Sequence, residues 1–238
     1  MKQPRTFLTA EWINLVMLNY VVDPSLLQPL VPFGTELDQH DGKTYASLIG
    51  FEFNNTRVFG VSIPFHRSFE EVNLRFYIRR GSRRGVVFVS ELVPKLAITA
   101  IARFAFGEKY SCVPMSHRVQ SRANDDVVEA EFSWGVGASR CTLQLETKGA
   151  GFLPAEASHS QFITEHYWGY AAKRNGGSLE YEVQHPQWKV REAKIAEFRG
   201  DGTRLYGAAL GKAILRPPDS AFLAEGSPVT VFKGTRLR

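Results

Sequence analysis

A stretch of strict alternation between residues 69 and 78 most constrains what this chain can fold into. Apolar side chains there alternate with an acid, an amide, a base and a phenol, which is the period of an extended strand. The apolar face would carry Val72, Leu74, Phe76 and Ile78, and the polar face Glu71, Asn73, Arg75 and Tyr77. Such a polar face either meets bulk water or lines a wet pocket inside a closed sheet, and the functional interpretation depends on which.

The composition is that of an ordinary soluble globular protein. Of 238 residues, 44% are hydrophobic and 22% charged, and one domain over residues 1–238 is expected because no linker or repeat divides them. The net charge of +5 is too mild to indicate nucleic acid by itself. The sequence shows neither a signal-peptide pattern nor an apolar run of about 20 residues, so no membrane partner and a cytoplasmic location are expected.

The remaining pattern predicts many strands and few helices. Strands are expected over residues 11–22, 45–53, 71–80, 86–93, 127–134 and 140–147, and helices over residues 24–30, 95–106 and 158–173. Asp23 before Pro24 favours a helix start, and Ser158 with Gln161 forms a capping box. Strands and helices do not alternate regularly, which argues against a doubly wound parallel sheet. The prediction is a mainly β (α+β) protein with a curved or closed antiparallel sheet and helices packed on it.

The polar face of the strand at residues 71–77 could bind a small acid. The Arg75 guanidinium would hold a carboxylate through two parallel hydrogen bonds, and Glu71 would act as the acid or base. The alternative is a sheet face that water solvates, which is the usual reason for an amphipathic strand.

Glu91 draws attention because it interrupts an apolar strand face. The other members of that face are Val87, Val89 and Val93. A carboxylate among them would have to be paired or have a raised pKa. One interpretation is therefore a site carboxylate, and the other is a structural ion pair with Lys95 or Arg103.

Lys109 follows the helix predicted to end at Phe106. A lysine in an apolar, electropositive pocket can lose its proton near neutral pH and attack a carbonyl to form a Schiff base. The alternative is a solvated lysine near a helix C-terminus, where a cation is favoured in any case.

The strongest run of charge is the turn from Arg79 to Arg84, which holds four arginines. It could touch phosphate groups, or it could be a solvated hairpin tip, since no aromatic platform accompanies it. His159 and His166 lie about two helical turns, or roughly 10 Å, apart, which is too far for one metal ion. No metal site and no cofactor are predicted.

In order and spacing, several segments resemble the DUF2071 (YqjF-like) family, a relative of the acetoacetate decarboxylase superfamily. The resemblance runs through nearly the whole chain. The segments that carry it are Val22-Asp23-Pro24, Leu30-Val31-Pro32, residues 69–75, residues 84–88, Ala102-Arg103, Tyr110, Pro114-Met115, residues 162–167 and residues 185–188. The resemblance implies a cone-shaped antiparallel β-barrel with flanking helices and a central cavity, and it favours the pocket interpretation of the polar face.

The same resemblance suggests where the site residues lie. Glu71 corresponds to a pocket glutamate of the superfamily, and Lys109 lies near the position of its Schiff-base lysine, with Tyr110 where a second lysine would pair with it. The candidate catalytic residues are Glu71 and Lys109. The candidate ligand-binding residues are Asn73, Arg75, Tyr77, Glu91, Arg103, Tyr110 and Met115.

The expected function is binding of, or action on, a small oxo acid or related carboxylate, without the paired-lysine site of acetoacetate decarboxylases. If the protein is an enzyme, its activity would be of a decarboxylase-like lyase or enolising type. The alternatives are a non-catalytic module that binds small molecules, and anion or nucleic-acid binding through the Arg79–Arg84 hairpin, of which nucleic acid is the less expected partner. Whether copies of the chain associate into a homo-oligomer stays open.

Overall fold

Alternating segments form long strands in the computed structural model, which describes residues 5–106, 109–122, 127–173 and 176–238. The strands within these residues are β1 (Thr6–Val22), β2 (Glu36–Leu37), β3 (Thr44–Val58), β4 (Phe69–Arg80), β5 (Arg83–Val93), β6 (Tyr110–Cys112), β7 (Met115–Arg122), β8 (Val127–Trp134), β9 (Cys141–Thr147), β10 (Trp168–Ala172), β11 (Ser178–Gln184), β12 (Val190–Arg199), β13 (Ser220–Phe232) and β14 (Thr235–Leu237). Every strand predicted from the sequence is present, and several extend further than predicted.

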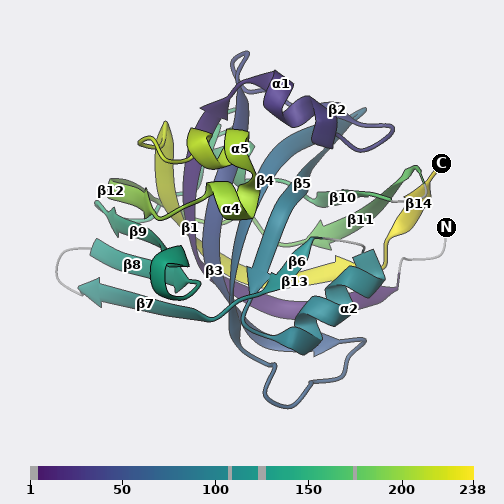
Figure 1. The fold of residues 1–238 in the computed structure, drawn as a ribbon, viewed down its shortest axis with the longest axis horizontal. Coiled ribbons are helices and arrows are strands. Elements are labelled where there is room, and N and C mark those ends of the chain that lie inside the picture. The colour runs from purple at the N-terminus through teal and green to yellow at the C-terminus, as the bar shows by residue number, and fades with distance from the viewer. Residues whose placement is uncertain (1–4, 107–108, 123–126, 174–175) are drawn as a thin grey trace.

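The helices are short, and each lies in a connection between two strands along the chain (Figure 1). They are α1 (Pro24–Leu27), α2 (Leu96–Phe106), α3 (His159–Thr164), α4 (Thr203–Tyr206) and α5 (Ala208–Ala213), with single 3₁₀ turns at residues 28–30 and 137–139. The predicted start of α1 is confirmed, because the Asp23 side chain accepts a hydrogen bond from the Ser25 amide at 2.8 Å. The capping box is confirmed in part, since the Ser158 hydroxyl accepts from the Gln161 amide at 3.2 Å.

The helix predicted over residues 158–173 is wrong in its second half. Helix α3 ends at Thr164, and Trp168–Ala172 form strand β10, which pairs with β11. Trp168 and Tyr170 are residues that favour strands, and pairing with β11 satisfies the backbone there. Gly169 fits this strand because a Cβ added to it would lie 2.1 Å from the Tyr181 ring.

Seven strands close into a ring in the order β11, β10, β5, β4, β3, β1 and β13, since β13 also pairs with β11. All these pairings are antiparallel except the short contact between β10 and β5. The expected antiparallel barrel-like sheet with flanking helices is therefore confirmed, although the contact of β10 with β5 inside the ring is parallel, which the sequence did not predict. Closing the ring pairs its edges and leaves an interior that side chains and ligands can occupy.

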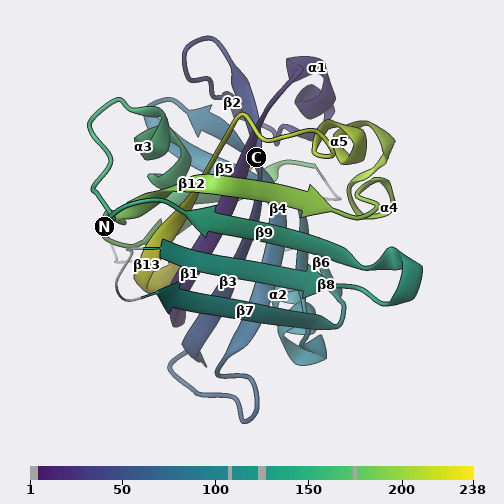
Figure 2. The same cartoon turned by 90° about the vertical axis from the view of Figure 1, so that its left-hand side faces the viewer.

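Strands β12, β9, β8 and β7 continue from β13 as a second layer. Figure 2 shows this layer lying across β1 and β3 on the outside of the ring. The two layers approach closely at Gly50, where an added Cβ would lie 2.9 Å from the Phe132 ring. The space between them holds the largest apolar cluster.

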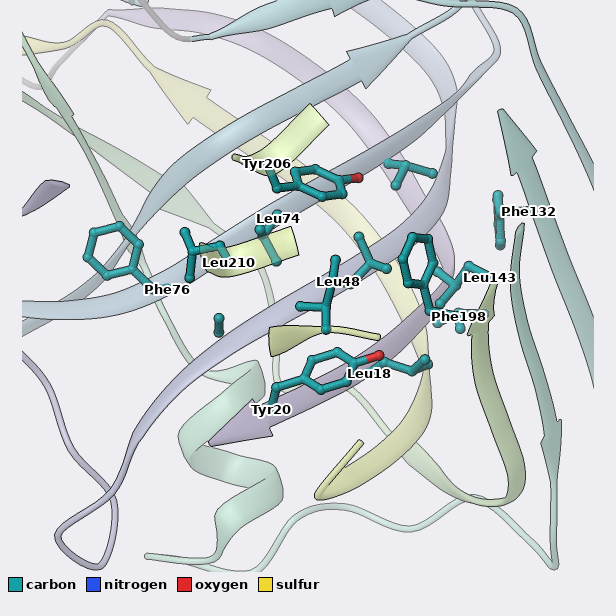
Figure 3. Close-up of a cluster of buried hydrophobic side chains, with 14 of the residues drawn as sticks. Leu18, Tyr20, Leu48, Leu74, Phe76, Phe132, Leu143, Phe198, Tyr206 and Leu210 are labelled. Carbon is teal, nitrogen blue, oxygen red and sulfur yellow. The ribbon is translucent and has the colours of Figure 1, made fainter. Parts of the chain in front are cut away.

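That cluster, the interlayer core, receives the apolar face of β4 (Figure 3). Its members from the ring wall include Leu18, Tyr20, Leu48, Leu74 and Phe76, those from the second layer include Phe132, Leu143 and Phe198, and helices α4 and α5 add Tyr206 and Leu210. The face carrying Val72, Leu74, Phe76 and Ile78 is thus buried, as the alternation predicted.

Candidate functional site

The other face of β4 lines a cavity inside the ring. All seven ring strands contribute to its wall, and helix α2 and strand β6 complete it. The space open to the centre of a water molecule is about 110 Å³, well above the roughly 10–15 Å³ that one water needs. Most lining residues are apolar. The polar and ionisable residues among them include Glu71, Asn73, Arg75, Glu91, Tyr110 and His166.

Three of the four polar residues predicted on β4 lie in this cavity. Glu71, Asn73 and Arg75 line it, and they are 2%, 3% and 8% exposed. The polar face therefore does not meet bulk water, and the pocket interpretation of the alternation holds. Tyr77, the fourth residue, is buried just beyond: its hydroxyl lies 2.6 Å from the Ser47 hydroxyl.

A β-bulge next to this row explains the position of Glu91. Leu74 pairs with Ser90 but Arg75 pairs with Phe88, so Val89 is an extra residue in β5. The bulge reverses the side-chain alternation, so that Phe88 and Glu91 both line the cavity. The prediction that Glu91 shares a face with Val87 and Val89 is wrong for this reason, since those two side chains pack in the interlayer core.

Glu71 is held by two donors in the cavity wall. Its Oε1 accepts a hydrogen bond from Asn73 Nδ2 at 3.0 Å, and its Oε2 accepts one from the Tyr110 hydroxyl at 2.9 Å. Burial raises the pKa of Glu71 to about 7, although both hydrogen bonds and the nearby Arg75 oppose the shift. Near neutral pH both the protonated and the ionised form of this carboxyl group are therefore accessible.

Arg75 is a buried cation that does not use all of its hydrogen-bond donors. Its Nη2 donates to the carbonyl oxygen of Ile163 at 3.0 Å, which fixes the guanidinium against helix α3. Its Nε is buried and has no hydrogen-bond partner among the described residues. Within the same residues no carboxylate forms an ion pair with Arg75, which lies over the Tyr77 ring at 5.6 Å and interacts with the Glu71 carboxyl only through the field of its charge. An anion in the cavity could therefore pair with it directly.

His166 completes the polar part of the cavity and was missed by the sequence analysis. Its ring lies 4.7 Å from the Tyr77 ring, and in the described structure neither buried ring nitrogen makes a well-formed hydrogen bond, although the ring interacts with the backbone of Ile163. Burial, together with Arg75 and Arg84, lowers the pKa of His166 well below its usual value, so the imidazole is neutral. The wrong extension of helix α3 hid this residue, because it placed His166 on a helix surface.

Glu91 and Tyr110 approach the site from adjacent strands. They are register partners in the parallel pair β5 and β6, and both line the cavity. Burial and the neighbouring Glu71 and Glu91 raise the pKa of the Tyr110 phenol well above its usual value, so it stays a donor. Arg103, one predicted partner of Glu91, lies in α2, but its side chain is outside the described part of the structure.

Two predicted site residues lie elsewhere. Lys109 is exposed and is not among the cavity-lining residues, and Met115 packs on the interlayer core. The structure thus brings together Glu71, Asn73, Arg75, Glu91 and Tyr110, adds His166, and leaves Lys109 and Met115 outside the cavity.

The arginines of the β4–β5 hairpin are paired within the molecule. Arg79 contacts Glu36 at 3.1 Å, Arg80 and Arg83 contact Glu180 at 3.3 and 2.8 Å, and Arg84 contacts Asp38 at 2.7 Å. Arg83 also lies over the Trp168 ring, 4.3 Å from its centroid. These contacts reduce the charge that the hairpin could offer to phosphate.

The described residues contain no group of three or more His, Cys, Asp or Glu placed to hold a metal ion. Over the same residues, no helix combines the length and apolar content needed to cross a bilayer.

Comparison with known proteins gives one family and several structural neighbours. The model of the DUF2071 family, described as an uncharacterized conserved protein, matches residues 9–228. The chain is 28% identical over 202 residues to the uncharacterized protein YqjF of Bacillus subtilis (strain 168), covering 84% of this chain and 81% of that protein.

Two solved structures illustrate the shared fold. The enduracididine biosynthesis enzyme MppR complexed with pyruvate matches with a TM-score of 0.69 at 13% identity, covering 100% of this chain and 92% of that one. Acetoacetate decarboxylase from Legionella pneumophila matches with a TM-score of 0.67 at 12% identity, covering 99% of this chain and 88% of that one. At these identities the likeness concerns the fold alone.

Proposed function

This chain belongs to the DUF2071 family, and from that premise we propose that its cavity binds a small oxo acid or a related carboxylate, and that Glu71 exchanges a proton with it. The observation that carries the proposal is Arg75: a buried guanidinium with an unused Nε that lines the same cavity as Glu71.

The acid group of the ligand would pair with Arg75. A guanidinium buried without a carboxylate partner is costly, and a bound carboxylate would supply both the charge and the missing acceptor. A carboxylate can pair with Nε–H and with the second N–H of Nη2, since the bond to Ile163 uses one of the two Nη2 hydrogens.

Glu71 and His166 would then face the rest of the ligand. A carboxyl group with a pKa of about 7 is suited to both giving and taking a proton at neutral pH. The Glu71 carboxylate would remove a proton from the carbon next to the oxo group. The electrons of the C–H bond would form a carbon–carbon double bond and move the carbonyl electrons onto oxygen, giving an enolate that accepts a hydrogen bond from the N–H of neutral His166. Return of the proton from Glu71 closes the cycle.

Structural neighbours support an oxo acid as the ligand. Structures of MppR contain pyruvate in one case and the condensation product of pyruvate and imidazole 4-carboxaldehyde in another. A lysine has no role in this reaction, because Lys109 is exposed and Tyr110 occupies the neighbouring position.

The test is binding and hydrogen exchange with pyruvate in deuterated water. Calorimetry would measure the affinity, and NMR would measure deuterium incorporation at the methyl group against a protein-free blank. We expect wild type to bind and exchange, Glu71→Gln to bind without exchange, and Arg75→Met to lose at least about 100-fold in affinity. Arg79→Met, on the same strand but exposed, is the matched control.

Three outcomes would change the proposal. Unaltered binding in Arg75→Met would remove the carboxylate site. Binding without exchange in wild type would leave a non-catalytic binding module. Reduction with borohydride in the presence of pyruvate should give no lysine adduct, and an adduct on Lys109 would replace Glu71 chemistry by Schiff-base chemistry.

A further inference from the structure

We infer that the preferred ligand is a carboxylic acid with a bulky branched or aromatic hydrocarbon group, bound with its acid group at Arg75 and its hydrocarbon group on an aromatic wall of the cavity. The inference rests on the proposed function and narrows its substrate class.

The aromatic wall consists of Trp12, Phe51, Phe53 and Phe69, which all line the cavity. Phe53 stacks on Phe69 with ring centroids 4.7 Å apart and an interplanar angle of 12°. Trp12 meets Phe51 and Phe53 edge-on, at 5.5 and 5.7 Å. These contacts fix the four rings, so the wall is a preformed apolar surface that a ligand can cover without ordering side chains.

The wall begins directly beside the polar row. Phe51 on β3 is the register partner of Glu71 on β4, and Phe53 is the partner of Phe69. Side chains of directly opposed residues lie about 4.5–5.5 Å apart at Cβ. A ligand whose reacting carbon lies near Glu71 therefore places its next substituent against Phe51.

Much of the remaining wall is apolar as well. Helix α2 supplies Ile98 and Ile101, and strands β3, β11 and β13 supply Val58, Val183 and Val231. A molecule of pyruvate size would satisfy Arg75 and Glu71 but leave most of this surface uncovered. Each added methylene group that leaves water for such a surface strengthens binding.

Other ligand classes fit less well. A sugar or nucleotide would place many hydroxyl or phosphate groups against four rings that together offer a single donor, the indole N–H of Trp12. A neutral hydrocarbon would cover the rings but leave Arg75 without an anion. The combination of one buried cation and a rigid aromatic wall selects an acid with one large apolar group.

Calorimetry with a short ligand series tests the inference on the unmodified chain. The probes are pyruvate, 4-methyl-2-oxopentanoate, phenylpyruvate and 4-methylpentan-2-one, which lacks the carboxylate. We expect 4-methyl-2-oxopentanoate and phenylpyruvate to bind at least about tenfold more tightly than pyruvate, and the ketone to bind more weakly than either.

The outcomes separate the inference from its premise. If pyruvate binds as tightly as the larger acids, the inference is overturned while the proposed function stands. If no acid binds, or if the ketone binds as tightly as 4-methyl-2-oxopentanoate, the proposed carboxylate site fails and the inference fails with it.

A variant that fills the apolar part of the cavity near Val58 tests where the hydrocarbon group binds. Val58→Phe should bring the affinity ratio of 4-methyl-2-oxopentanoate to pyruvate close to one, because the new ring occupies space that the larger acid needs. Val61→Phe, an exposed position three residues further on, is the matched control and should keep the wild-type ratio. An unchanged ratio in Val58→Phe, with the same melting temperature as wild type, would contradict the inferred position of the hydrocarbon group.

Discussion

The two faces of strand β4 differ in what they bury, although their residues alternate along one segment of chain. Val72, Leu74, Phe76 and Ile78 enter the interlayer core, where all four are at most 1% exposed. Glu71, Asn73 and Arg75 are nearly as buried, but they face an open cavity. Both faces are therefore buried. They differ because one face carries polar groups and borders an empty cavity, whereas the other packs in the apolar core.

The comparison shows where this protein accepts a cost in stability. On the core side, the buried polar atoms without hydrogen-bond partners in the described structure include the hydroxyl oxygens of Tyr20 and Tyr206 and the indole nitrogen of Trp134. On the cavity side, such atoms include Arg75 Nε, Asn73 Oδ1 and both nitrogens of His166. A partly unpaired guanidinium is more costly than an unpaired phenol or indole because it carries a charge, and a ligand is the simplest reason for keeping it.

The largest expected effect comes from breaking the core face. Leu74→Ala should lower the free energy of unfolding by about 2–5 kcal/mol, because it opens a void in a packed cluster. Leu15→Ala is the matched comparison, since Leu15 is equally buried but lines an existing cavity. Urea unfolding should show a loss at least about 1 kcal/mol smaller for Leu15→Ala, and equal losses would erase the contrast between the two sides.

Glu71→Gln should stabilise the fold increasingly as pH rises. Glutamate in the unfolded chain ionises near its ordinary pKa of 4.5, whereas burial raises the folded-state pKa to about 7. Between these values the folded state binds more protons, so wild type loses stability as pH rises through this window and does not regain it above. Glutamine stays neutral, and the variant should gain about 1–3 kcal/mol relative to wild type from pH 4.5 to pH 8.

Urea unfolding at a series of pH values measures this difference. The exposed Glu156→Gln is the control and should show no trend of comparable size. A difference between Glu71→Gln and wild type that shrinks with rising pH would mean that Glu71 is stabilised as a carboxylate.

Tyr110→Phe should raise the pKa of Glu71 further, by about one unit. The phenol donates to the Glu71 carboxylate, and a hydrogen bond to a charged group contributes about 1.5–3 kcal/mol. Carboxyl NMR titration of labelled glutamate measures the change directly. Tyr167→Phe is the control, and a Glu71 pKa that stays the same in Tyr110→Phe would show that the phenol does not set it.

The smallest effect is expected at the end of the same strand. Arg79→Ala removes an ion pair with Glu36 in which both side chains are more than half exposed, so unfolding should change by less than about 0.5 kcal/mol. If thermal or urea unfolding showed that Arg79→Ala lowers the free energy of unfolding by more than about 1 kcal/mol, surface arginines would matter more for stability than this comparison implies.

Much of the fold was predictable because strand periodicity is a local signal. The alternation at residues 69–78 predicted the correct strand and its two faces, and the patterns at residues 127–134 and 140–147 predicted the correct strands. The ring closure by β11 and β13 was not predictable from local pattern, because it joins segments far apart in the chain. Strand β10 was predicted as helix because the N-cap at Ser158 indicates where a helix begins but not where it ends.

The site was predictable to the extent that it lies on one strand. The parity of β4 placed Glu71, Asn73 and Arg75 on one face, and the family resemblance favoured a pocket over bulk water at that face. The position of His166 could not be predicted, because it depends on where α3 ends. The face on which Glu91 lies could not be predicted either, because it depends on a β-bulge that no residue pattern indicates. Lys109 is exposed although the family resemblance pointed to it, since sequence proximity does not fix the direction of a side chain.

The strict alternation of β4 means that this protein can change its ligand far more easily than it can change the length of that strand. Substitutions on the cavity face of β4 or β5 alter only the lining, because the core face keeps its own residues. A one-residue deletion between Glu71 and Arg75 would instead put these two side chains on opposite faces of the sheet, whereas a deletion at Val89 would remove only the extra residue and keep Glu91 opposite Asn73. Relatives that bind different molecules should therefore vary in the identity of the cavity residues while conserving the spacing between Glu71 and Arg75.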